Sequence, residues 1–358
     1  MEVKRLNYLD NIRWITVVLV VIYHIIYLFN NSGVISNISV KGIPIMDSFL
    51  IFVYPWFMCL LFVIAGISSK YSLQKRTNKE FIKDRVKRIL LPSILGIFIY
   101  GWVSSLITSC YVDMFDGNGA MIPGVIKYFI YCLMGIGPLW FCHVLFIGSD
   151  LIALIRKIDK KDILGRLSKK VNLPILLALV FIVWGSAFIL NTPFITVYRF
   201  GIYLLMMLLG YYVFSNQELI KKIEKICIPL SIISILLGII YVITYYGVNY
   251  TDNSVLDDLF TNVYLWITII SILGLGSKWL NFKNKFTEYM SKNNFNIYFL
   301  HYVVVVLLGY VTVTFLHLPF IINYIIILLG TIILLPGLIE IIKRIPIIRF
   351  MILGISKE

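Results

Sequence analysis

A series of long apolar runs restricts the fold of this sequence more than any other feature. Each run is long enough to cross the roughly 30 Å hydrocarbon core of a bilayer as a helix. Hydrophobic residues make up 60% of the 358 residues and charged residues only 14%, so a soluble domain could not bury so much apolar surface. We therefore predict an all-α integral membrane protein, with about ten transmembrane helices in one bundle and a single domain over residues 1–358. The predicted spans lie at about 14–29, 49–68, 89–110, 139–155, 174–190, 199–215, 227–246, 259–276, 296–316 and 321–342.

The segment 121–138 has no single assignment. Its sequence, MIPGVIKYFIYCLMGIGP, is apolar but short, and Gly and Pro interrupt it. An interfacial or re-entrant segment fits this pattern, and so does an eleventh span.

The basic residues predict which side of the membrane each loop faces. When Lys4 and Arg5 are placed inside and the spans alternate, most of the 32 Lys and Arg fall on the same side, with dense clusters at 70–88 and 156–170. This asymmetry follows the positive-inside rule and places both termini in the cytoplasm. The net charge of +14 is then a property of one membrane face, where anionic lipids attract it. It predicts no nucleic-acid partner.

Arg13 and His24 are the sharpest candidate functional pair. Ionisable residues within spans are costly and are functional candidates by default. The eleven-residue separation is almost three helical turns, which puts both residues on one face about 16 Å apart. Arg13 can hold an anion at the cytoplasmic surface, and His24 can act as a general base within the membrane. A long ligand with a charged head, such as acyl-coenzyme A, fits this spacing, although the spacing alone also arises by chance.

Two further arginines lie in the stretch FIKDRVKRILLPSILG at 81–96. Arg85 and Arg88 are three residues apart, so they are neighbours on a helical face and can clamp a phosphate. A cluster that serves only the positive-inside rule would look similar. Asp10, three residues before Arg13, is expected to cap the first helix or to pair with Arg13.

The remaining polar residues in the spans have structural interpretations. Arg199 and Glu340 lie near span ends, where snorkelling explains them. Asp150 follows His143 by two helical turns and predicts a buried polar pair. The four histidines lie in four separate regions and the five cysteines show no CxxC spacing, so we predict no metal site.

Six segments together resemble acyltransferase family 3, a family of multi-spanning membrane acyltransferases. YLDNIRWITVVLVVIYH (8–24) matches its pattern of Arg, ten residues and His, and DRVKRILLP (84–92) matches its Arg-x-x-Arg loop. Ala65 stands where the family usually has serine. The chain is most similar to the branch that contains the succinyltransferase of osmoregulated periplasmic glucans. The other four segments are PWFMCLLFVIAGISS (55–69), GPLWFCHVLF (137–146), NNFNIYFLHYVVV (293–305) and EIIKRIPIIRFMILG (340–354).

The resemblance implies an enzyme that moves an acetyl or succinyl group from cytoplasmic acyl-CoA to a hydroxyl of an extracytoplasmic carbohydrate. His24 would be the catalytic histidine, with His301 assisting it. Arg13, Arg85 and Arg88 would hold the donor. Trp140 would line the path of the substrate, although a Trp there also suits an interface anchor, and His301 also suits a simple bond between helices.

The same resemblance sets expectations for location and partners. It implies a multi-pass protein of the bacterial plasma membrane that binds no permanent cofactor and takes acyl-CoA as its donor substrate. The acceptor would be an exopolysaccharide, a wall polymer, a glucan or a glycolipid, and the polysaccharide-synthesis machinery is a candidate partner.

A transporter or flippase that exports a lipid-linked sugar or polysaccharide is the alternative. Ten spans with a few ionisable groups would suit it as well. The sequence has no detectable repeat between its halves and no paired spans broken by Gly and Pro, which transporters often show. We therefore favour the enzyme.

Overall fold

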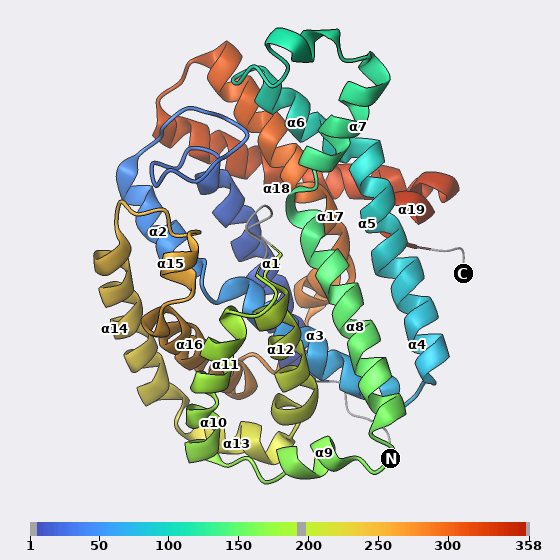
Figure 1. Cartoon of the computed structure of the whole chain (residues 1–358), viewed down its shortest axis with the longest axis vertical. Coiled ribbons are helices and arrows are strands. Elements are labelled where there is room, and N and C mark those ends of the chain that lie inside the picture. Colours follow the sequence, from blue (N-terminus) through green and yellow to red (C-terminus); the bar gives the residue numbers. More distant parts are fainter. Residues whose placement is uncertain (1–5, 192–197, 356–358) are drawn as a thin grey trace. The chain divides into compact units, whose positions relative to one another are not determined.

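The computed structural model describes residues 6–191 and 198–355. All regular secondary structure in these ranges is helical, apart from one isolated bridge between Asn191 and Arg199 (Figure 1). Eight helical stretches are long and apolar enough to cross a membrane. They are Asn7–Tyr27 (α1), Pro44–Leu73 (with α2, Asp47–Val53, and α3, Phe57–Leu73), Asn78–Ser109 (with α4, Asn78–Arg85, α5, Leu91–Gly96, and α6, Trp102–Ser109), Gly137–Ile158 (with α8, Trp140–Ile158), Cys227–Tyr245 (α14), Leu259–Trp279 (α16), Lys285–Leu316 (with α17, Lys285–Val311) and Phe320–Arg344 (α18).

The remaining helices are shorter. Three of them form apolar stretches at Gly124–Met134 (α7), Leu173–Ala187 and Phe200–Phe214. The second stretch consists of α10 (Leu173–Ala178) and α11 (Val180–Ala187), and the third of α12 (Phe200–Leu209) and a π-helical turn. The other short helices are α9 (Ile163–Ser168), α13 (Gln217–Lys225), α15 (Asn253–Leu256) and α19 (Pro346–Leu353).

These helices confirm the predicted all-α membrane architecture. Eight of the ten predicted spans are long apolar helices, whereas the spans predicted at 174–190 and 199–215 are shorter and in two pieces. The ambiguous segment 121–138 contains α7. The cytoplasmic location of both termini stays a prediction, and Lys4 and Arg5 lie outside the described residues.

The chain divides into two compact units, and the single domain over 1–358 stays a prediction. The first unit contains the chain up to Thr16, Ile51–Arg85 and Val144–Lys292. The second unit contains Val17–Leu50, Val86–His143 and the chain from Asn293 onward. Each unit is described by itself below.

Close backbone approach holds the first unit together. α3 packs against α12 and the π-helical turn that follows it, at Gly66 and Gly210. A Cβ at Gly66 would lie 2.0 Å from the Met207 carbonyl oxygen, and one at Gly210 would lie 2.1 Å from that of Val63. Glycine has no side chain, so the two backbones can approach this closely. Lipid offers no hydrophobic force between helices, and such close packing is what holds membrane helices together.

Hydroxyl pairs join α14 to α16 in the same unit. The Ser231 and Ser271 hydroxyl oxygens lie 2.8 Å apart, and the hydroxyl oxygens of Ser234 and Thr268 are equally close. Such bonds satisfy polar groups that a bilayer could not hydrate.

The second unit brings its C-terminal helices against α5. α19 packs on both α18 and α5 and ends at Gly354, whose φ of +64° is a left-handed conformation that glycine adopts without strain. A Cβ on Gly354 would lie 2.9 Å from the Lys87 carbonyl oxygen. The predicted family segments at 84–92 and 340–354 therefore meet.

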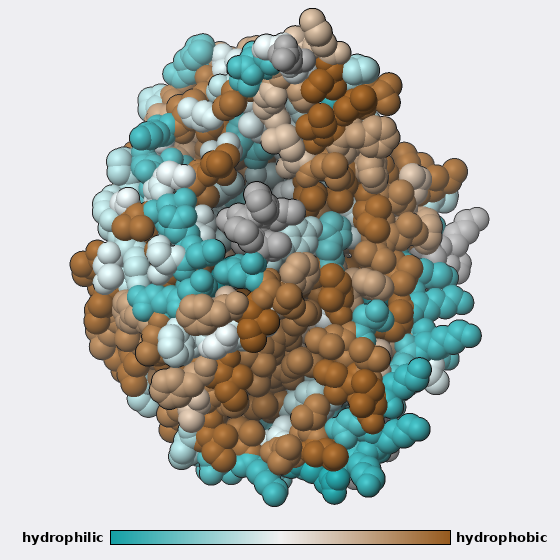
Figure 2. All heavy atoms as spheres, in the orientation of Figure 1, coloured by the Kyte–Doolittle hydropathy of each residue, from teal (hydrophilic) through white to brown (hydrophobic). Residues whose placement is uncertain are grey.

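Apolar side chains cover the outer surface of several helices. Figure 2 shows brown, apolar side chains over α8, α10 and α11 of the first unit, whereas teal, hydrophilic ones gather over α4. Phe181 and Ile182 on α11 are 61% and 55% exposed. An exposed apolar surface of this kind is what a lipid-facing helix requires.

Replacement of Gly66 by alanine tests the packing of α3. The added methyl group collides with the backbone at Met207, so Gly66→Ala should lower the free energy of unfolding by about 1–3 kcal/mol. Gly185→Ala is the matched control, since a Cβ on Gly185 meets nothing within 4 Å. Thermal unfolding of the detergent-solubilised protein measures both, and equal midpoints would contradict the close approach of α3.

Candidate active site

His24 and His301 form a hydrogen-bonded pair inside the second unit. His24 lies near the end of α1 and is partly exposed, whereas His301 on α17 is fully buried. The distance from His301 Nε2 to His24 Nδ1 is 3.2 Å, and the ring centroids lie 5.1 Å apart. Two residues that are 277 positions apart in the sequence thus form one polar unit.

Backbone carbonyls determine which nitrogen of each neutral ring carries the proton. His301 Nδ1 lies 2.8 Å from the Tyr298 carbonyl oxygen, and because a carbonyl only accepts, Nδ1 must donate. The lone pair of His301 is then on Nε2, which accepts a hydrogen bond from His24 Nδ1–H. His24 Nδ1 also lies 2.8 Å from the Val20 carbonyl oxygen.

This arrangement leaves the lone pair of His24 on Nε2. That nitrogen can take a proton from a reacting group, while His301 holds the opposite side of the imidazole. The positive charge that His24 then acquires is stabilised through Nδ1–H, so the pair has the geometry of a base and its orienting partner.

Tyrosine rings surround His24. Its ring centroid lies 4.9 Å from that of Tyr302, 5.3 Å from that of Tyr23 and 6.0 Å from that of Tyr27, in edge-on arrangements. Such ring contacts limit the orientations of the imidazole.

Asn37 fixes one of these rings from the segment that follows α1. The Tyr302 hydroxyl donates to Asn37 Oδ1. Asn37 Nδ2 in turn donates to Thr108 Oγ1 at 2.8 Å and to the Ser104 carbonyl oxygen at 3.1 Å, both on α6. Asn37 thus connects α6 to the tyrosine beside His24.

Trp140 lies where the predicted GPLWF segment packs against α17. Gly137 has a φ of +45°, and a Cβ there would lie 2.9 Å from the Tyr302 ring. The Tyr298 hydroxyl donates to the Pro138 carbonyl oxygen at 2.8 Å. Trp140 is only 8% exposed and packs edge-on to Phe141. This burial favours an internal role for Trp140 over the alternative of an interface anchor.

Arg13 is held by two partners in the first unit. Its guanidinium donates to Asp10 Oδ1 at 3.0 Å and to Ser68 Oγ at 2.5 Å. The pairing with Asp10 is as predicted, and Ser68 comes from the predicted family segment at 55–69. The Arg13 side chain is still 25% exposed, so part of its positive charge is accessible to a ligand.

The helical face predicted for Arg85 and Arg88 is interrupted. α4 ends at Arg85, and a π-helical turn from Val86 to Leu90 contains Arg88. Because a π turn has more residues than an α turn, the spacing of three no longer aligns the two side chains. Arg85 stacks over the Phe81 ring at 4.7 Å, and Arg88 is exposed. π turns often mark functional positions in helices.

Two predictions about charged residues are wrong. Arg199 does not snorkel, because it is 6% exposed and bonds to Asp257 Oδ1 at 3.0 Å. Asp150 is exposed rather than part of a buried pair. Both errors arise because the position of a residue within an apolar run does not reveal which face of the helix is covered.

Asn37, Tyr302 and Ser68 are site residues that the sequence analysis missed. Tyr302 directly follows His301, and Ser68 lies within a family segment, so their neighbours offered a signal. Asn37 offered none, since its partner Tyr302 is 265 positions away.

The fold and the paired histidines define a membrane-embedded protein with a hydrogen-bonded histidine pair among its helices. The chain matches the family model described as an acyltransferase domain over residues 6–338, and it therefore belongs to acyltransferase family 3. It is a multi-pass membrane enzyme that transfers acyl groups. Neither the curated proteins nor the solved structures contain a match to the chain. Among the described residues, no three His, Cys, Asp or Glu gather into a metal site.

Loss of the Asn37 side chain should slow the enzyme without unfolding it. Asn37→Ala removes the acceptor of the Tyr302 hydroxyl and the two bonds to α6. Of these, the bond to Tyr302 is the one beside His24, and its loss of about 0.5–1.5 kcal/mol predicts a roughly two- to tenfold lower kcat. Steady-state acyl transfer measures this loss. Tyr246→Phe, at an exposed tyrosine, should change nothing. A wild-type kcat in Asn37→Ala would remove Asn37 from the site.

Proposed function

We propose that the protein transfers an acetyl or succinyl group from cytoplasmic acyl-CoA to a hydroxyl of an extracytoplasmic carbohydrate. The proposal rests on the hydrogen bond between His301 and His24. Because His24 donates this bond from Nδ1, its lone pair is on Nε2, which points away from His301. A sugar hydroxyl is a poor nucleophile at neutral pH and needs a base of this kind.

The reaction follows from this base. His24 Nε2 takes the proton of the acceptor hydroxyl as its oxygen attacks the thioester carbonyl carbon. The bond between that carbon and sulfur then breaks, and the CoA thiolate takes the proton from His24 as it leaves. An ester of the carbohydrate and free CoA are the products. His301 acts through His24, because it accepts the Nδ1–H bond and steadies the imidazolium.

Three arginines are assigned to the donor. Arg13, with its partly exposed guanidinium, would bind phosphate groups of acyl-CoA. Arg85 and Arg88 would add positive charge from the end of α4 and the π-helical turn. Trp140 would line the path of the donor arm or the sugar. These roles are supported by the matching segments of the family and by the chemistry of each side chain.

The acceptor and the location are proposed as classes rather than as one compound and one organism. We assign the protein to a bacterial plasma membrane, with an exopolysaccharide, a wall polymer, a glucan or a glycolipid as acceptor and the polysaccharide-synthesis machinery as partner. Residues 340–354 resemble the glucan succinyltransferase branch, so succinyl-CoA is tested as a donor beside acetyl-CoA.

Labelled donors test the proposal directly. Membranes with the wild-type protein should transfer label from radioactive acetyl-CoA or succinyl-CoA into extractable carbohydrate, and His24→Ala should lower the rate about 10²- to 10⁴-fold, because it removes the base. His317→Asn is the matched control, since His317 has a φ of +48° that Asn tolerates.

Protein levels must be equal in all membranes. His301→Gln should retain more activity than His24→Ala, since His301 orients the base and does not touch the substrate. Label that is independent of His24 would exclude its role, and the absence of label from either donor would exclude both acyl groups.

Substitution of Arg13 separates donor binding from chemistry. Arg13→Gln should raise the KM for acyl-CoA about 10- to 100-fold, which corresponds to one lost charged hydrogen bond, and should leave kcat nearly unchanged. The measurement is acyl transfer as a function of donor concentration. Arg166→Gln serves as control, because Arg166 is exposed on α9 outside the family segments. A fall in kcat at constant KM would instead place Arg13 with the reacting groups.

A further inference from the structure

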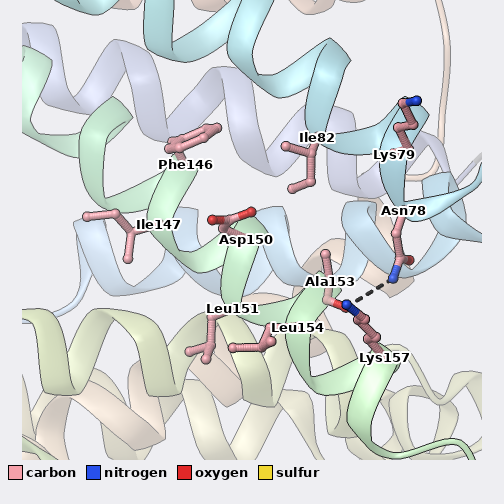
Figure 3. Close-up of a pocket in the computed structure, with 10 residues that line it drawn as sticks. All are labelled: Asn78, Lys79, Ile82, Phe146, Ile147, Asp150, Leu151, Ala153, Leu154 and Lys157. Carbon is pink, nitrogen blue, oxygen red and sulfur yellow. Dashed lines mark hydrogen bonds between the residues drawn. The ribbon is translucent and has the colours of Figure 1, made fainter.

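A groove between α4 and α8 in the first unit lies where the hydrophilic surface over α4 meets the apolar surface over α8. Its volume is about 530 Å³, within the range of small-molecule sites. Both helices belong to candidate membrane spans. The lining combines three charged side chains, an amide and several apolar side chains, which Figure 3 shows: Asn78, Lys79, Ile82, Phe146, Ile147, Asp150, Leu151, Ala153, Leu154 and Lys157.

Asp150 lies in the middle of this groove without a partner. Its side chain is exposed, and Figure 3 shows the carboxylate directed into the space between α8 and α4. Within residues 6–191 and 198–355, it makes no hydrogen bond or ion pair. A carboxylate in a membrane span is costly without a partner and marks a functional site by default. The partner of Asp150 must therefore come from outside the described chain.

Two lysines stand toward the other end of the groove. Lys157 follows Asp150 by seven residues, which places it two turns along the same face of α8. Lys79 comes from α4, and neither ammonium forms an ion pair within the described part of the chain. Asn78 Nδ2 donates to the Ala153 carbonyl oxygen at 3.0 Å and so joins α4 to α8 beside them.

The far end of the groove is apolar. Ile82 of α4 faces Phe146 and Ile147 of α8, and the 41% exposure of Ile147 shows that this end is open. Phe146 and Lys157 are eleven residues apart, so the groove follows α8 for about 16 Å. A hydrocarbon chain fits such a strip because its lining is apolar, and the bilayer supplies chains of this kind.

We propose that the groove binds a zwitterionic phospholipid whose head group carries a primary amine. The phosphate would bind Lys79 and Lys157, and an acyl chain would lie along Ile82, Phe146 and Ile147. Because Asp150 lies between these two ends, the flexible head group would fold back from the phosphate so that its ammonium donates to Asp150. Two cations beside one carboxylate match a head group in which an anion and a cation are neighbours. This site is independent of the acyl transfer proposed above.

Other lipid head groups match the lining less well. An anionic lipid without an amine would satisfy the lysines but leave Asp150 without a donor and close to a negative charge. A quaternary ammonium carries no N–H, so it could not donate a hydrogen bond to the carboxylate. The carboxylate therefore provides the selectivity, and the lysines provide affinity for any phosphate.

Lipid binding to the purified, delipidated full chain tests the site. Native mass spectrometry gives the affinity for phosphatidylethanolamine, phosphatidylcholine and phosphatidylglycerol, each added alone. The wild-type protein should bind phosphatidylethanolamine at least tenfold more tightly than phosphatidylcholine. Asp150→Asn should remove this preference, and Lys79→Gln with Lys157→Gln should weaken all three lipids.

Two further variants keep the test decisive. Glu218→Gln removes an exposed carboxylate on α13 and should leave every affinity unchanged. Ile147→Trp should fill the apolar end and lower binding even if Asp150→Asn proves unstable. The proposal is wrong if the wild-type protein shows no preference for the amine lipid, if Asp150→Asn keeps the preference, or if phosphatidylglycerol binds most tightly.

Discussion

The bilayer offers no water to polar groups, and this constraint determines which contacts the helices must make. Helices satisfy the backbone internally, but each polar side chain within a span needs a partner from the backbone of its own helix, from another element or from a ligand. Ser231 with Ser271 and Arg199 with Asp257 meet this need between helices and loops of the first unit. His24 with His301 meets it in the second unit.

The same constraint makes the histidine pair suitable for catalysis. In water an imidazole exchanges freely between its two tautomers, but the carbonyl of Tyr298 fixes the proton of His301, and His301 fixes that of His24. The proposed base is thus oriented before any substrate arrives, which is the condition under which fixed polar groups lower a barrier most effectively. The orientation depends on Tyr302 and Asn37 as well, since Asn37 holds the Tyr302 ring beside the imidazole.

The sequence predicted those features that depend on local pattern. Run length located eight long membrane helices. The motifs pointed to His24 and His301, which form a hydrogen-bonded pair, and to Arg13, which pairs with Asp10; their catalytic and binding roles stay predictions. The sequence analysis failed where distant contacts decide. The span predicted at 174–190 is broken between α10 and α11, and Arg199 is buried because Asp257, 58 positions away, approaches it. The π-helical turn at Val86–Leu90 is likewise invisible to a spacing rule that assumes an α-helix.

Asp150 differs from Arg13 in having no partner within the described chain. Arg13 and Asp150 are both charged residues in apolar runs, yet Arg13 bonds to Asp10 and Ser68, whereas Asp150 has no partner in the described chain. Because a carboxylate in a membrane span is costly without a partner, we propose that the partner of Asp150 is supplied by the membrane itself. A charge that the protein leaves unsatisfied in a lipid-facing groove therefore points to the lipid.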